Sequence, residues 1–324
     1  MLNFAWSWAR DGRWRCSAAV AQLVEQCFRK AWVTGSSPVS GSAVMRKDWI
    51  MSSNGSRADC AVGIFDSGLG GLTVVREVQR ILPQESVIYY GDTARVPYGN
   101  KSPETVTRYS RQIVDFLLER NVKAIVVACN TATAYALEEL EKQYAERVEI
   151  IGVVKPGVKA ALDSTRSGRI GVIGTRGTIA SGVYERELRA ARADVEVTAL
   201  ATPLLVPLVE EDWLDHDAAR LIVREYLEPL KAAEVDTVVL GCTHYPLLKG
   251  VLAEELGSEV KLVDSAENAA RALGEALQSG GLQSSAMGIG ELKLFVSDVP
   301  EIFGPLAERF LGTSVQAVQR APLD

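Results

Sequence analysis

The sequence predicts an α/β protein made of two similar halves, each a parallel sheet covered by helices. Three observations predict this class. Short apolar runs alternate with helix-periodic segments over most of the chain. Residues 124–140 and 237–248 share one order of features, an apolar run, a cysteine, a polar pair and an apolar helix-periodic segment. A glycine-containing turn stands ahead of each of these stretches, so the order repeats along the chain.

The first 59 residues do not follow this pattern. The pieces GSSPVSGS and SSNGS are typical of linkers, and the segment lacks the uninterrupted apolar run of a secretory signal. We expect residues 1–59 to be a disordered extension, and we hypothesise that the natural protein begins at Met45 or Met51. The alternative is a genuine flexible or regulatory extension. The intact mass of the protein from its native host distinguishes the two.

Nine apolar runs rich in β-branched residues are the expected strands, at residues 62–65, 87–90, 125–128, 150–154, 170–173, 195–200, 238–240, 261–263 and 292–296. Helical patterns separate most of them. Residues 105–120, for example, place apolar side chains at helical spacing on one face. Such alternation favours parallel sheets covered on both faces. We expect a first α/β domain of residues 60–155 plus 265–324, and a second of residues 156–264.

Composition narrows the function. A chain of 324 residues that is 47% apolar can build two domains. Its net charge of −6 argues against nucleic acid as the main partner, and no run reaches the roughly 18 apolar residues of a membrane helix. Five cysteines are too few and odd in number for a disulfide framework, which fits a reducing cytoplasm. With two histidines and no His/Cys cluster, we expect no metal ion.

Cys242 lies in the stretch TVVLGCTHYPLL, residues 237–248. The apolar start is typical of a strand buried on both faces, and Pro246 suits the first position of a helix. We therefore expect Cys242 at the carboxyl end of a strand, where open α/β sheets bind ligands. His244, two residues further on, is close enough to be its proton-handling partner. The alternative is a histidine that only caps the turn.

Cys129 occupies the matching place in AIVVACNTATAYALEEL, residues 124–140, where Asn130 or Thr131 can cap the helix. A helix N-terminus lowers the pKa of a thiol from its usual value of about 8.5, and both cysteines are placed to feel this effect. One such cysteine alone is usually a small buried hydrophobe. Two thiols that face one cleft, however, can remove a proton from one side of a substrate carbon and return one on the other. That chemistry inverts a stereocentre.

Asp66 lies in the glycine-rich segment GIFDSGLGG, residues 63–71, between an apolar strand and a helix. Glycines let a ligand approach the backbone, and N–H groups at a helix start favour anions. The segment is neither a Walker loop nor a dinucleotide fingerprint, so a carboxylate is the expected ligand. An acid in an anion site must hold a cation or move a proton. The alternative is that Asp66 merely caps the following helix.

Four segments, GIFDSGLGGLTV, YYGDTARVPYGNKS, VVACNTATA and LGCTHYPLL, together resemble the glutamate racemases of the cofactor-independent aspartate/glutamate racemase family. The resemblance runs from about residue 61 to the C-terminus. It implies two pseudosymmetric α/β domains with the active site between them. It also implies glutamate as the substrate, no cofactor, a cytoplasmic location, a role in bacterial cell-wall precursor synthesis and a homodimer.

The resemblance assigns roles to individual residues. It implies that Cys129 acts on D-glutamate with help from Asp66, and that Cys242 acts on L-glutamate with help from His244 and Glu210. Glu211 leaves the last of these open, because either acid fits the position and Glu210 could be only a solvated acid at a helix start. The implied substrate contacts are Asp66, Ser67, Pro97, Tyr98, Gly99, Asn130, Thr131, Thr175, Thr243 and His244.

Three other functions remain open. A Cys-His amidohydrolase would use Cys242 and His244 and leave Cys129 without a role. A racemase of a related amino acid such as aspartate would keep both thiols. A non-catalytic amino-acid binding protein would keep the cleft but tolerate loss of both cysteines.

Overall fold

The computed structural model describes residues 7–8, 14–15, 56–315 and 317–323. Contacts divide the chain into two units, Met1–Ile50 and Met51–Asp324. In the first, β1 (Ser7–Trp8) pairs antiparallel with β2 (Trp14–Arg15). Most of the predicted extension, together with both hypothetical start positions, lies outside the described residues, and its last part forms the 3-10 turn η1 (Arg57–Asp59). No helix within the described ranges has the length and apolar character needed to cross a membrane.

The second unit contains a sheet of six parallel strands in the order β12-β11-β4-β3-β5-β6. Its strands are β3 (Val62–Asp66), β4 (Val87–Gly91), β5 (Ala124–Val127), β6 (Glu149–Gly152), β11 (Leu292–Val296) and β12 (Val318–Arg320). The helices and turns around it are α2 (Leu72–Ile81), η2 (Thr93–Arg95), η3 (Tyr98–Asn100), α3 (Pro103–Leu118), α4 (Asn130–Tyr144), α11 (Ser265–Ser279) and α12 (Pro300–Leu311).

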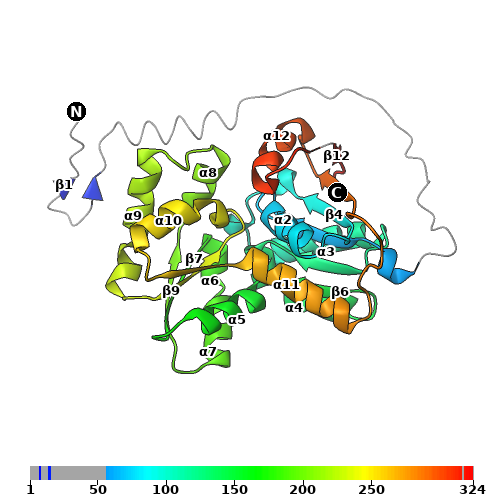
Figure 1. The fold of residues 1–324 in the computed structure, drawn as a ribbon. Helices are drawn as coiled ribbons and strands as arrows, with labels where there is room; N and C mark the ends of the chain where they lie inside the picture. The colour runs from blue at the N-terminus through cyan, green and yellow to red at the C-terminus, as the bar shows by residue number, and fades with distance from the viewer. Residues whose placement is uncertain (1–6, 9–13, 16–55, 316, 324) are drawn as a thin grey trace. The chain divides into compact units, whose positions relative to one another are not determined.

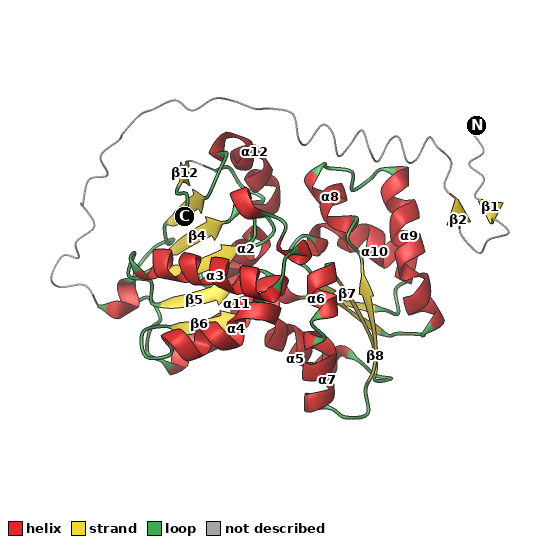
Figure 2. Ribbon diagram, turned by 180° about the vertical axis from the view of Figure 1, so that it is seen from behind, coloured by secondary structure: helices red, strands yellow, loops and turns green. Residues whose placement is uncertain are grey.

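A second sheet in the same unit has four parallel strands in the order β10-β9-β7-β8. Its strands are β7 (Arg169–Gly174), β8 (Glu196–Ala201), β9 (Thr237–Gly241) and β10 (Lys261–Asp264). Its helices and turns are α5 (Val154–Ser164), α6 (Arg176–Ala180), α7 (Val183–Ala191), α8 (Leu205–Glu210), α9 (Asp217–Ala232), η4 (Tyr245–Leu248) and α10 (Lys249–Leu256). Figure 2 shows the two groups of strands, each flanked by helices.

The two sheets repeat one strand order. The run β4-β3-β5-β6 matches β8-β7-β9-β10 strand for strand, and β11 and β12 extend only the first. The predicted α/β class with two parallel-sheet halves is therefore confirmed, and all nine predicted strands are present. Three described strands were not predicted, namely β1, β2 and β12, and β12 has three residues, two of them exposed. The exact domain boundaries, at residues 155/156 and 264/265, stay a prediction.

Both faces of the first sheet carry apolar side chains, because successive residues of a strand point to opposite sides. Ile64 and Val126 pack into a core with α2, α11 and α12, whereas Phe65 and Val127 pack into another with α3 and α4. The first of these cores continues through α8, α9 and α10 of the second sheet. Helices thus occupy the faces of the first sheet, and the carboxyl ends of its strands meet at one edge.

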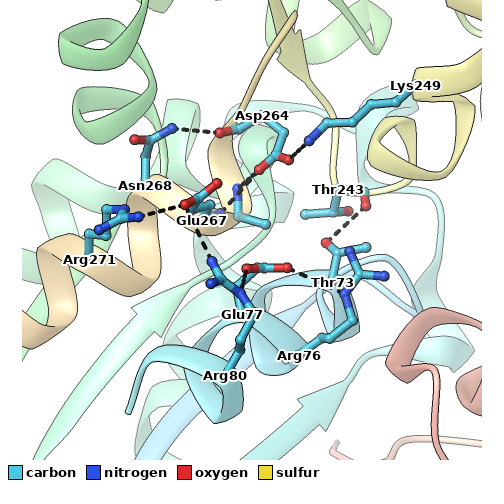
Figure 3. A network of polar contacts seen from close by, with 11 residues as sticks. Thr73, Arg76, Glu77, Arg80, Thr243, Lys249, Asp264, Glu267, Asn268 and Arg271 are labelled. Atoms are coloured by element: carbon cyan, nitrogen blue, oxygen red, sulfur yellow. Dashed lines mark hydrogen bonds and ion pairs between the residues drawn. The ribbon is translucent and has the colours of Figure 1, made fainter.

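Helix α11 links the two sheets (Figure 1). It starts directly after β10 and packs against both α2 and α5. Asp264 caps it, since its carboxylate accepts the N–H groups of Ala266 and Glu267, and it also pairs with Lys249 of α10. Arg80 of α2 pairs with Glu267 at 3.3 Å, so the start of α11 is bonded to helices of both sheets (Figure 3).

Asp236, one residue ahead of β9, is expected to stabilise the fold in a pH-dependent way. Its carboxylate accepts hydrogen bonds from Thr165 Oγ1 at 2.6 Å and from the N–H groups of Arg166 and Ser167 at 2.8 and 2.6 Å. Burial alone would raise the pKa of Asp236, but these bonds hold it well below its usual range. A depressed folded-state pKa stabilises the fold above the unfolded value of about 3.9. This contribution disappears as the pH falls through the folded value.

Asp236→Ala should therefore lower the free energy of unfolding by about 1–3 kcal/mol at pH 7 and flatten its acid dependence, as measured by urea denaturation. Asp194→Ala is the control, because that side chain is 82% exposed. Equal denaturation midpoints for the two variants would contradict the prediction.

Candidate active site

The two strand-end cysteines line one cavity. Cys129 follows β5 of the first sheet, Cys242 follows β9 of the second, and each is only 6% exposed. The other predicted residues that line the cavity are Ser67, Pro97, Tyr98, Gly99, Asn130, Thr131, Thr175, Thr243 and His244. Asp66 and Glu210 do not line it but contact residues that do. The lining residues that sequence reasoning missed are Val96, Thr178, Val206 and Gly241.

Cys129 is itself the N-cap of α4. Its Sγ accepts the N–H of Ala132 at 3.4 Å and donates toward Ser67 Oγ at 3.7 Å. The expectation that Asn130 or Thr131 caps this helix is therefore wrong. Burial, followed by the charge of Asp66, raises the pKa of the Cys129 thiol to about 12, and the Ala132 N–H only partly offsets this. The predicted lowering of this pKa is wrong too, because desolvation outweighs the helix N-terminus.

Asp66 ends β3, directly beside β5, and is fully buried. Its Oδ2 accepts the N–H of Gly68 at 3.0 Å, and its Oδ1 accepts the hydroxyl of Thr243 at 3.4 Å. It does not cap α2, whose N-cap is Gly71. Burial raises the pKa of Asp66 despite the opposing charge of His244 and the backbone N–H groups. A raised pKa brings a carboxyl closer to the range in which it gains and loses protons at neutral pH.

His244 connects Cys242 to Glu210. Its Nδ1 lies 3.8 Å from Cys242 Sγ, and its Nε2 lies 3.1 Å from Glu210 Oε1 at the end of α8. Burial favours the neutral ring, but the hydrogen bonds to Cys242 and Glu210 outweigh it and raise the pKa of His244 to about 10. These two contacts thus favour the protonated form of the ring. The helix after it starts as the 3-10 turn η4, which contains Pro246, and becomes α-helical only at Lys249.

The glycine-rich segment of the first sheet touches the cysteine turn of the second. A Cβ on Gly70 would lie 2.2 Å from Thr243 Oγ1 and 2.5 Å from His244 Nδ1. Thr73, at the start of α2, donates its hydroxyl to the Thr243 carbonyl at 3.1 Å (Figure 3). Glycine at position 70 thus permits a close approach between the two sheets beside the thiols.

Three threonine hydroxyls form a cluster on the cavity wall. Thr131, Thr175 and Thr178 are mutually hydrogen-bonded at 2.9–3.1 Å. Thr175 caps α6. A Cβ added to Gly99 would lie 2.7 Å from the Cβ of Thr175, so the two residues pack closely. Thr178 was missed, although it stands one helical turn after Thr175 in the sequence GTRGT.

Tyr98 is held from behind the cavity. Its hydroxyl donates to the fully buried Asp92, whose carboxylate also pairs with Arg95 at 2.8 Å. The neighbouring residues Pro97 and Gly99 line the cavity with it. Tyr98 thus anchors this segment against the cavity.

Each of the two thiols that line the cavity has a titratable side chain near it. Cys129 has Asp66, and Cys242 has His244 backed by Glu210. Among residues 56–315 and 317–323, no group of three His, Cys, Asp or Glu side chains is placed to hold a metal ion. Acid–base chemistry from two directions is what these side chains can perform.

Known proteins resemble this chain over most of its length. The family model described as Asp/Glu/Hydantoin racemase matches residues 71–273. Glutamate racemase of Geobacter metallireducens is 53% identical over 264 residues, which are 82% of this chain and 97% of that protein. A crystal structure of a glutamate racemase isoform from Bacillus anthracis superposes with a TM-score of 0.77 at 40% identity, covering 82% of this chain and 97% of that one. Glutamate racemase from Francisella tularensis, in complex with D-glutamate, has a TM-score of 0.77 at 34% identity, covering 82% and 99%.

Proposed function

The chain belongs to the Asp/Glu/hydantoin racemase family and is an amino-acid isomerase of its glutamate racemase branch, and from this premise we propose that it interconverts L- and D-glutamate through two thiols, without a cofactor. The observation that carries the proposal is the single cavity lined by Cys129 and Cys242 from two different sheets. The D-glutamate bound to the Francisella tularensis relative supports the choice of substrate.

In the direction from L to D, Cys242 removes the α-proton of L-glutamate as a thiolate. Cys129, as a thiol, returns a proton to the opposite face of the same carbon. One C–H bond breaks, one forms, and the proton deficit passes from Cys242 to Cys129. The pKa of about 12 for Cys129 in the free site supports its starting role as a proton donor. The reverse reaction uses the same steps backwards.

Each thiol needs a group that resets its proton after a turnover. We assign this role to Asp66 for Cys129 and to His244, supported by Glu210, for Cys242. An α-proton of an amino acid is a very weak acid, so the site must also stabilise the developing negative charge. Nearly complete exclusion of water strengthens every charge interaction there.

The carboxylates of the substrate are expected to meet hydroxyl and amide donors on the cavity wall. The cluster of Thr131, Thr175 and Thr178 offers hydroxyl groups on one part of the cavity wall. Further donors are the side chains of Ser67, Asn130 and Thr243, and Pro97, Tyr98 and Gly99 shape the wall between them.

Deuterium incorporation tests the proposal. L-glutamate incubated in D₂O with reduced enzyme and no added cofactor should yield D-glutamate carrying deuterium at the α-carbon. Absence of both exchange and optical change, with folded and reduced protein, would refute it. L-aspartate assayed alongside distinguishes a glutamate racemase from an aspartate racemase.

Two rival readings predict different outcomes. A Cys-His amidohydrolase built on Cys242 and His244 would form a covalent acyl-enzyme and would retain activity in Cys129→Ala. A binding protein would take up glutamate but exchange no α-proton. The presence of a second thiol on the same cavity favours the racemase over both.

The biological role follows from the product. We propose that the chain supplies D-glutamate for peptidoglycan in the cytoplasm. Expression in a bacterial strain that requires D-glutamate should then restore growth, and failure to do so would contradict this role. We also propose a homodimer, and a monomeric mass in sedimentation equilibrium would exclude it.

Glu210→Gln should move the alkaline limb of the pH profile. Glu210 contributes to the raised pKa of His244, so its loss lowers that pKa from about 10. The imidazolium is then lost at lower pH, and the alkaline limb of kcat should shift down by about one pH unit. The measurement is kcat between about pH 6.5 and 10.5, with Glu211→Gln as the control. Identical alkaline limbs for Glu210→Gln and the parent would show that Glu210 is only a solvated acid.

Gly70→Ala should reduce turnover strongly. The added methyl meets Thr243 Oγ1 and His244 Nδ1 at 2.2 and 2.5 Å, so these side chains must move. Displacement of about 1 Å in a catalytic site can cost about 10²-fold in rate. Gly250→Ala is the matched control, because nothing lies within 4 Å of its added Cβ. Equal kcat values in the two variants would contradict the expectation.

A further inference from the structure

The side chain of Asn130 carries a buried amide donor that no described residue satisfies. The side chain is 2% exposed and lines the cavity directly after Cys129. Its Oδ1 accepts the hydroxyl of Tyr184 at 2.6 Å. Its Nδ2 has no hydrogen-bond partner among the residues that the structure describes. A buried donor without a partner is costly, and in a cavity it points to a ligand that supplies the acceptor.

The Tyr184 contact leaves one end of the Asn130 amide without a partner. Hydroxyl-to-oxygen hydrogen bonds are typically about 2.7–2.8 Å long, whereas bonds from nitrogen are about 2.9–3.0 Å. The phenol hydroxyl donates to Oδ1 at 2.6 Å, a length in keeping with an O–H···O bond, and Nδ2 is the end without a partner among the described residues. Such a bond holds the amide so that the –NH₂ group remains free for a ligand.

Tyr184 reaches the site from the second sheet. It lies in α7, is buried, and packs in the core beneath β7 and β9. A Cβ on Gly241, the residue before Cys242, would lie 3.1 Å from the Tyr184 ring. The same side chain thus touches the backbone next to one thiol and bonds the residue next to the other.

We propose that Tyr184 is a positioning residue, whose hydroxyl orients the Asn130 amide so that Nδ2 donates to a carboxylate oxygen of the amino-acid substrate. The inference rests on the proposed function for the identity of the ligand. Tyr184 does not touch the reacting atoms, and it acts through Asn130 alone. Its role is to pre-order a donor that would otherwise rotate.

Tyr184→Phe tests this directly, since it removes one hydroxyl and keeps the ring. We expect KM for glutamate to rise about tenfold, the effect of one lost hydrogen bond, while kcat changes less than about threefold. Tyr144→Phe is the matched control, because that buried hydroxyl bonds Asp115 away from the cavity, at 2.9 Å. Its KM should equal that of the parent.

The double variant Tyr184→Phe/Asn130→Ala separates positioning from general packing. If Tyr184 acts only through the amide, the double variant should match Asn130→Ala alone. The inference would be overturned if Tyr184→Phe had the KM of the wild type. It would also be overturned if the rise in KM of the double variant equalled the product of the rises in the two single variants.

Calorimetric binding of D-glutamate to the parent and to Tyr184→Phe separates this inference from the proposed function. If the parent binds D-glutamate without racemising it, only the proposed function fails, and a weaker affinity in Tyr184→Phe still supports the positioning role. If the parent neither racemises nor binds D-glutamate, both the proposed function and the positioning role of Tyr184 are wrong.

Discussion

Replacing Cys129 with alanine is expected to slow racemisation about 10²–10⁴-fold in both directions, and Cys242→Ala should do the same. Each thiol serves one face of the α-carbon, and inversion needs both faces. Both side chains line one cavity and each is only 6% exposed. Bulk water therefore cannot take over the proton transfer of a missing thiol. Circular dichroism of glutamate measures the rate, and Cys60→Ala, outside the cavity, is the control.

The two alanine variants should differ in a partial reaction. With Cys242 alone, L-glutamate can still lose its α-proton and regain a deuteron on the same face in D₂O. Cys129→Ala should therefore exchange L-glutamate without inversion, and Cys242→Ala should exchange only D-glutamate. Full racemisation activity in Cys129→Ala would contradict the two-thiol mechanism. Retention of a hydrolytic activity in this variant would favour the amidohydrolase.

Asp66→Asn should produce the second large loss, about 10²-fold in kcat, because the amide cannot carry the proton of Cys129. Asn is close in size to Asp and can still accept the Gly68 N–H, so the fold should persist. The loss should be greatest when D-glutamate is the substrate, since Cys129 must then start as the base. The thiol pKa of about 12 makes that step dependent on its partner.

The control for this prediction is Asp194→Asn, whose side chain is 82% exposed. Thermal unfolding should show a folded protein for both variants. A parent-like kcat in Asp66→Asn with D-glutamate would mean that another group resets Cys129.

Much of the fold and the site follows from short sequence patterns. The apolar runs before Asp66, Cys129 and Cys242 were long enough to predict strands, and residues after parallel strands meet at one sheet edge. Family resemblance then brought in Tyr98 and Thr175, which composition alone would have left in ordinary turns. The cavity is lined by Cys129, Cys242, Tyr98 and Thr175, which come from both sheets, and Asp66 lies behind its wall in contact with Thr243.

Other features depend on packing that no local pattern encodes. Tyr184 occupies a core position of an ordinary amphipathic helix, and only the assembled fold brings its hydroxyl to Asn130. The rise in the Cys129 pKa depends on burial from both sheets, so helix position alone predicted the wrong direction. β12 escaped prediction because three residues carry too little periodicity.

The unequal flanks of the two thiols have a kinetic consequence. A carboxyl is near Cys129 and a histidine ring is near Cys242. The free protein that carries the proton on the Cys129 sulfur therefore differs in energy from the free protein that carries it on the Cys242 sulfur. Mirror-image amino acids have equal free energy in water, which fixes their equilibrium ratio at unity and requires equal kcat/KM for both. Any faster turnover of one enantiomer must therefore be matched by a proportionally larger KM for it.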